Sequence, residues 1–264
     1  MKEVNILELY RTTITNMRNY INNYDLMSVI DDIKNATIPD NYKFRKDKYI
    51  WQRESLKGII NRPFVSQEDS IAPEHAQKFY LYEYSLIHKV KTQKFGYIIA
   101  YELPFFDNRL SGAIDLVGYD DTNNILNLIE LKNCAIGSKK DSNESLIKAI
   151  LEIETYTRFI NEIRKNKEMN ITLINDILNE LKNKFDIDIP FEKLNDLTIK
   201  KNLLIPESLY TKSLKTDKEI LNNIPDDISI YFIKLKDNDF NASQRIIDVA
   251  RDNDFVFQIT ENEQ

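Results

Sequence analysis

Residues 112–133 read GAIDLVGYDDTNNILNLIELKN. Two mostly apolar runs flank residues 120–124, where Asp, Thr and Asn are concentrated. These residue types favour turns, so the stretch predicts two β-strands joined by a hairpin, with Thr122 and Asn123 as a two-residue loop. Because side chains alternate between the two faces of a strand, the spacing of any charged residue in these strands is informative.

Three charged side chains interrupt the apolar strands. Asp115 lies in the first strand, and Glu130 and Lys132 lie two residues apart in the second, so the latter two point to the same face. The two-residue loop places Asp115 directly opposite Glu130. Facing carboxylates repel each other, and Mg²⁺ binds one or two carboxylates through oxygen. We therefore expect a site for Mg²⁺ or Mn²⁺ here, with Lys132 beside it.

These residues resemble the PD-(D/E)xK nuclease superfamily. Asp115 matches the aspartate of that superfamily, and Glu130-Leu131-Lys132 matches its (D/E)xK motif. The likeness is greatest to the RecB-type and NucS-type branch. In that branch a G-x-I-D strand and an ELK strand precede a helix with a Gln-x-x-x-Tyr motif.

Two further motifs of the branch have counterparts in the chain. Gly112-Ala113-Ile114-Asp115 fits the first strand, although the proline that often precedes the aspartate is absent. Glu152-x-x-x-Tyr156 stands where Gln-x-x-x-Tyr is expected, with glutamate in place of glutamine. The resemblance covers residues 75–165.

The resemblance implies a mixed α/β fold with an αβββαβ restriction-endonuclease-like core. Apolar periodicity predicts one broken or two short helices over 4–35, further helices over 73–91, 143–166, 171–185 and 241–251, and strands over 95–106, 203–205, 228–235 and 255–259 beside the hairpin. Residues 186–200 are polar and predict a loop that could contain a short helix. We expect one nuclease-like domain over 1–264, with 73–165 and about 200–260 as catalytic core, 1–65 as a helical N-terminal elaboration and 171–200 as a helical insertion.

The resemblance also implies an activity, the metal-dependent hydrolysis of phosphodiester bonds in nucleic acid. DNA is favoured over RNA, and repair, restriction and phage defence all fit. The implied metal ligands are Glu83, Asp115, Glu130 and the backbone carbonyl of Leu131, with Glu102 as an alternative. The implied catalytic residues are Asp115, Glu130, Lys132, Glu152 and Tyr156. Endonuclease and exonuclease cleavage both stay open, and many enzymes of this kind act as homodimers.

Other interpretations of the same residues stay open. A non-catalytic member of the fold would bind nucleic acid or a protein partner. In a purely structural hairpin, Lys132 would only neutralise Glu130 and leave Asp115 as an isolated charge on an apolar strand, which is costly. On the helix over 143–166, Lys148 and Glu152 could form an exposed salt bridge.

Composition restricts cofactors and location. The single cysteine, Cys134, excludes an intramolecular disulfide and the four-cysteine iron–sulfur cluster of some RecB-type nucleases. No apolar run reaches about 18 residues, and the N-terminus becomes charged too early for a signal peptide, so we expect a cytoplasmic protein with no membrane partner.

The net charge is −6, yet residues 41–100 hold eleven Lys or Arg against six Asp or Glu. This segment is either a phosphate-binding surface or an ordinary solvated one.

Overall fold

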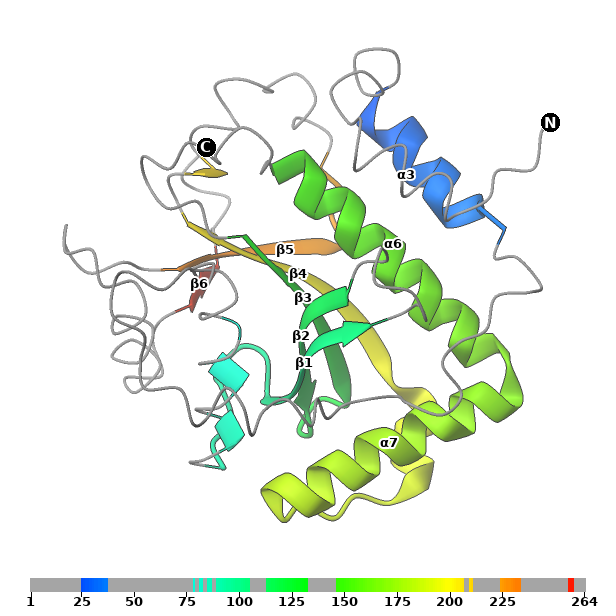
Figure 1. Ribbon diagram of the computed structural model, residues 1–264, viewed down its shortest axis with the longest axis vertical. Coiled ribbons are helices and arrows are strands. Elements are labelled where there is room, and N and C mark those ends of the chain that lie inside the picture. Colours follow the sequence, from blue (N-terminus) through cyan, green and yellow to red (C-terminus); the bar gives the residue numbers. More distant parts are fainter. Residues whose placement is uncertain are drawn as a thin grey trace.

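The computed structural model describes residues 25–37, 78, 81–82, 85–86, 89–104, 113–132, 146–206, 209–210, 224–233 and 256–258. In this part of the chain a six-stranded sheet is flanked by helices (Figure 1). The strands are β1 (Tyr97–Pro104), β2 (Ala113–Asp120), β3 (Ile125–Leu131), β4 (Thr198–Pro206), β5 (Ile228–Ile233) and β6 (Val256–Gln258). They lie in the sheet in the order in which they occur in the sequence.

The sheet is mixed. Strands β1, β2 and β3 are antiparallel neighbours, β3–β4 and β4–β5 are parallel pairs, and β6 is antiparallel to β5. A parallel pair needs a long crossover connection, and helices α6 (Leu146–Lys165), α7 (Lys167–Phe185) and the short 3₁₀ helix η1 (Phe191–Asp196) lie between β3 and β4. The expected mixed α/β class is therefore confirmed.

The hairpin has the expected register but a longer loop. Leu116 pairs with Ile129, and the pairing runs without a shift to Asp120 and Ile125. The loop therefore comprises residues 121–124, and the expectation of a two-residue loop is wrong. The register survives because the four-residue loop has the same midpoint. Asn124 takes the left-handed conformation, with φ of 56°, at the end of this loop.

Asp120 stabilises the loop through its carboxylate. Its Oδ1 accepts a hydrogen bond from the Thr122 amide at 3.0 Å, and its Oδ2 accepts one from Asn123 Nδ2 at 2.6 Å. The ammonium group of Lys91 lies 2.9 Å from the same carboxylate. These contacts account for the choice of turn residues between the two strands.

Helix α6 crosses one face of the sheet, and α3 (Leu26–Asn35) packs beside it (Figure 1). The part of the expected helix over 143–166 that the structure describes is thus confirmed. Helix α7 begins at Lys167, four residues earlier than expected, because the Asn166 side chain accepts hydrogen bonds from two first-turn amides. None of the described helices is long and apolar enough to cross a membrane.

The loop expected over 186–200 extends too far, because its last residues belong to strand β4. Strand β4 begins at Thr198, where it pairs with Ile125 at the start of β3. Thr198 and Lys200 are exposed while Lys201 is buried, so the polar start of the strand resembles a loop in sequence. Backbone pairing with a buried neighbour overrides that local polarity.

Apolar side chains fill both faces of the sheet. The larger cluster joins the sheet to α3, α6 and α7. The second cluster includes Leu81 and Tyr82 together with Leu116, Ile129 and other strand residues. Residues 78, 81–82 and 85–86 are helical, as expected for 73–91. The helices expected over 4–24 and 241–251 lie outside the described residues.

Candidate active site

The antiparallel strands bring two of the expected carboxylates together. Continuing the β2–β3 register by one residue from Leu116 and Ile129 places Asp115 opposite Glu130, as the sequence predicts. The side chains are 8% and 2% exposed. Two carboxyl groups on adjacent strands in a buried setting need compensating charge.

Glu102 extends the row of carboxyl groups to a third strand. Its neighbours on β1 pair with β2 on both sides, Tyr101 with Leu116 and Leu103 with Ile114, so Glu102 lies across from Asp115. Its φ is 47°, a left-handed conformation that is strained in a residue other than glycine. Backbone strain of this kind is concentrated at functional sites.

Asp115 has a charge partner that the sequence interpretation missed. Lys78 Nζ donates to Asp115 Oδ1 at 2.6 Å and lies 3.7 Å from Glu102 Oε1. The amide of Leu131 donates to Asp115 Oδ2 at 2.8 Å. The expectation that Asp115 would be isolated unless a metal neutralised it is therefore wrong. Lys78 precedes Tyr82 by one helical turn on the expected helix, and a lysine at that position of an apolar stripe was the available signal.

Lys132 joins the hairpin to helix α6. Its Nζ lies 2.6 Å from Glu130 Oε1 and 2.7 Å from Glu152 Oε2, and its side chain is 5% exposed. Its backbone amide is fixed by the carbonyl of Leu204 on β4 at 3.1 Å. The alternative was an exposed salt bridge between Lys148 and Glu152. It is wrong, because Glu152 is buried.

The electrostatics separate the two glutamates that contact Lys132. Burial and the field of Asp115 raise the pKa of Glu130 well above its ordinary value, and Lys132 offsets this only in part. Burial also opposes ionisation of Glu152, but Lys132, Lys148 and a hydrogen bond from Glu130 lower its pKa below the ordinary value. Their surroundings therefore shift the two carboxyl groups in opposite directions, Glu130 towards its protonated form and Glu152 towards its ionised form. With both ionised, Glu130 Oε2 would have no hydrogen-bond donor among the described residues.

Of the remaining predicted site residues, the structure describes Tyr156 and Leu131. Tyr156 lies one turn after Glu152 on α6 and is buried in the larger apolar cluster. Leu131 is buried on β3 and holds Asp115 through its amide. Glu83 lies outside the described residues.

The donor set fits a hard divalent cation bound by two carboxylates. Asp115 and Glu130 offer oxygen atoms on adjacent strands, and Mg²⁺ prefers such ligands while it keeps several waters. Among the described residues, however, no group of three or more His, Cys, Asp or Glu side chains is arranged to hold a metal ion. Any such site would therefore be built from Asp115 and Glu130 together with backbone oxygen and water.

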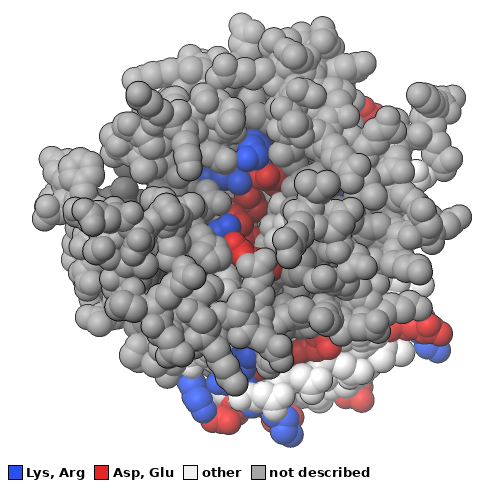
Figure 2. Space-filling view, in the orientation of Figure 1, with Lys and Arg blue, Asp and Glu red and all other residues white. Residues whose placement is uncertain are grey.

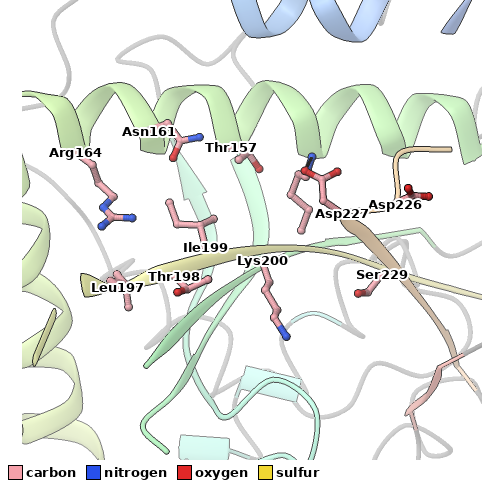
Figure 3. A pocket seen from close by; sticks show the side chains of 11 residues that line it. Thr157, Asn161, Arg164, Leu197, Thr198, Ile199, Lys200, Asp226, Asp227 and Ser229 are labelled. Atoms are coloured by element: carbon pink, nitrogen blue, oxygen red, sulfur yellow. Dashed lines mark ion pairs between the residues drawn. The ribbon is translucent and has the colours of Figure 1, made fainter. Parts of the chain in front are cut away.

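A hollow lies away from these residues, at the N-terminal ends of β4 and β5. It has a volume of about 520 Å³, and Figure 3 shows Thr157, Asn161 and Arg164 along α6, with Arg164 at the left above Leu197 and Asp226 and Asp227 at the right. Lys201 on its wall contacts Glu154 at 2.5 Å and Asp227 at 2.7 Å. None of the predicted site residues lines this hollow. Among its charged lining residues, Lys201 and Asp227 are paired with each other.

The described surface carries both signs of charge. In Figure 2, acidic and basic side chains lie against each other near the centre of the view and again over α7 along its lower edge.

No protein-family model, no curated protein and no solved structure matches the chain. The resemblance to the PD-(D/E)xK superfamily accordingly rests on the residues and their placement.

Proposed function

We propose that this protein is a metal-dependent nuclease that hydrolyses phosphodiester bonds in nucleic acid, with DNA as its preferred substrate. The observation that carries the proposal is the grouping of Asp115, Glu130 and Lys132. The three side chains meet at adjacent strand ends in the register that the motif requires, and all are buried. Buried charged residues are costly to the fold unless they are paired, and clusters of them are concentrated at functional sites.

The order of elements supports the same proposal. The helical residues 78, 81–82 and 85–86, strands β1 to β3, helix α6 and strand β4 follow one another in the order αβββαβ of the resembled superfamily. Helix α7 and η1 stand where an insertion before the last core strand is expected.

Asp115 and Glu130 would hold Mg²⁺ or Mn²⁺, together with the carbonyl of Leu131. A cation bound there would polarise the scissile phosphate and lower the pKa of a coordinated water. Burial and Asp115 raise the pKa of Glu130, and a cation bound beside it would favour the ionised form that serves as a ligand.

Lys132 would orient the attacking water and offset the charge that develops on the phosphoryl oxygens. Its ammonium group needs a fixed direction for this role, and the contacts to Glu130 and Glu152 restrict it. Glu152 is then a positioning residue on α6. Tyr156, buried one turn later, would hold the helix against the sheet.

The test is a cleavage assay of the full chain on labelled single- and double-stranded DNA and RNA, with Mg²⁺, with Mn²⁺ and with EDTA. Wild type should cut at least one substrate in the presence of metal, and Asp115→Asn and Lys132→Ala should not. Lys165→Ala is the matched control, because Lys165 is 69% exposed at the end of α6 and should cut like wild type. Cutting that persists in EDTA or in both site variants would contradict the proposal.

One observation favours a second candidate, a non-catalytic module that binds nucleic acid or a protein partner. Lys78 and Lys132 already compensate carboxylates in the site, so the fold does not require a cation. Binding of one substrate in the same panel without any cutting would favour this candidate. Cutting that depends on Lys132 would exclude it.

A further inference from the structure

The ammonium group of Lys78 occupies a place that the proposed cation also needs. Its Nζ lies 2.6 Å from Asp115 Oδ1, and the lysine side chain is 9% exposed. The other carboxylate oxygen, Oδ2, accepts the Leu131 amide. Both oxygens of Asp115 therefore have a partner in the cation-free protein.

We propose that Lys78 is a displaceable counter-ion, which holds the place of the divalent cation at Asp115 and moves to Glu102 when the cation binds. The inference rests on the proposed function, because it takes Asp115 as a metal ligand. A divalent cation on Asp115 would lie within a few ångströms of the ammonium group. Like charges at that distance repel strongly where water is excluded.

Glu102 gives the lysine a second carboxylate within reach. Its Oε1 lies 3.7 Å from Lys78 Nζ, whereas Asp115 Oδ1 lies at 2.6 Å. A short movement of the ammonium group would exchange the closer partner for the farther one without carrying the charge into water. Glu102 also has the left-handed φ of 47°, a strained conformation of the kind that is concentrated at functional sites.

The two lysines of the site differ in this respect. Lys132 lies 2.6 Å from Glu130, which is also a proposed metal ligand, and 2.7 Å from Glu152, so it keeps a close carboxylate contact to Glu152 when Glu130 takes a cation. Lys78 lies 2.6 Å from Asp115, the other proposed carboxylate ligand, and 3.7 Å from Glu102, so it must move to gain a close contact with Glu102. Lys78 is thus the lysine whose position sets how readily the site takes up a cation.

The consequence is a site with two states. In one, Lys78 neutralises Asp115 and the protein is stable without metal. In the other, the cation takes Asp115 and Lys78 pairs with Glu102. The energy needed to move Lys78 lowers the apparent affinity for the cation, so the site fills only when the cation is plentiful.

The test is Mn²⁺ binding to the full chain, measured by isothermal titration calorimetry at one fixed pH. Lys78→Met removes the competing charge, and it should bind Mn²⁺ at least tenfold more tightly than wild type, about 1.4 kcal/mol. Lys78→Arg keeps the charge and should bind like wild type. If Lys78 only stabilised the fold, its substitution would weaken Mn²⁺ binding. A gain in Mn²⁺ affinity is therefore expected only if Lys78 competes with the cation.

Lys91→Met is the matched control. Lys91 also pairs with aspartates, Asp120 and Asp121 at 2.9 and 2.5 Å, but at the opposite end of β2. Its loss should leave the Mn²⁺ affinity unchanged. If Lys78→Met does not fold, Lys78→Gln keeps a hydrogen-bond donor for Asp115 without the charge, and the same tenfold gain is expected. Equal or weaker binding by the folded Lys78 variant would overturn the proposal.

The Asp115→Asn variant distinguishes failure of the counter-ion proposal from failure of the proposed metal site. If wild type binds Mn²⁺ and Asp115→Asn does not, the metal site of the proposed function stands. Unchanged affinity in Lys78→Met then overturns the counter-ion alone. If no variant binds Mn²⁺, both the metal site and the counter-ion are overturned.

Discussion

Lys132 and Glu152 form a buried ion pair that ties the end of the hairpin to α6, and removing one partner should cost more than removing both. The atoms Nζ and Oε2 are 2.7 Å apart, and the side chains are 5% and 8% exposed. In Lys132→Ala, Glu152 stays buried and loses the ammonium group that offsets its burial. Breaking a buried pair in this way costs about 3–5 kcal/mol of unfolding free energy.

The lower end of that range applies here. Lys148 also lowers the pKa of Glu152 and still does so in the variant. Burial and Asp115 raise the pKa of Glu130, which limits the negative charge that it adds beside Glu152. We therefore expect Lys132→Ala to lose about 3 kcal/mol. The double variant Lys132→Ala/Glu152→Gln has no uncompensated charge and should lose only about 1 kcal/mol, chiefly from the lost packing of the lysine stem.

The assay is urea unfolding in EDTA, followed by circular dichroism, with free energies from linear extrapolation. Adding Glu152→Gln to Lys132→Ala should restore about 2 kcal/mol of unfolding free energy. This is a large coupling in a double-mutant cycle. Arg158 and Glu162 provide the control pair on the same helix, since Glu162 is 36% exposed and their coupling should be about 0.5 kcal/mol. If the double variant is no more stable than Lys132→Ala, the reasoning about the buried pair is refuted.

Two further predictions concern the hairpin. Gly118→Ala would place a Cβ 2.3 Å from the carbonyl oxygen of Phe95, so urea unfolding should show a loss of at least about 2 kcal/mol, and a variant as stable as wild type would contradict the packing of β2 described above. Burial opposes ionisation of Asp120, but hydrogen bonds from Lys91 and the turn lower its pKa to about 2. Its contribution is therefore present above the ordinary value of 3.8 and is lost as the pH falls towards 2. Asp120→Asn should cost up to about 1 kcal/mol at pH 7 and almost nothing near pH 2, and a difference that does not change with pH would count against this assignment.

The hairpin and its two acidic residues could be predicted because the information is local. Turn-forming residues fix the midpoint of the hairpin, and the midpoint fixes which residues of the two strands face each other. The register that brings Asp115 opposite Glu130 follows from that midpoint even though the loop proved longer. Side-chain alternation then places Lys132 beside Glu130.

Contacts between distant segments could not be predicted in the same way. Lys78 reaches Asp115 across 37 residues of sequence, and only the packing of its helix against the sheet brings them together. Lys201 finds Glu154 across 47 residues for the same reason. The start of β4 was missed because its first residues are polar and exposed. Each of these features depends on the fold as a whole rather than on local composition.

Cleavage by Glu130→Gln tests the central claim most directly. Burial and Asp115 favour the uncharged form of Glu130, which glutamine resembles, so the variant should fold and should melt in EDTA no lower than wild type. Glutamine cannot supply a carboxylate to the cation, so cleavage of the substrate identified in the panel should fall by roughly a hundredfold or more. A folded Glu130→Gln protein that cuts at the wild-type rate would show that Glu130 is not part of a nuclease active site.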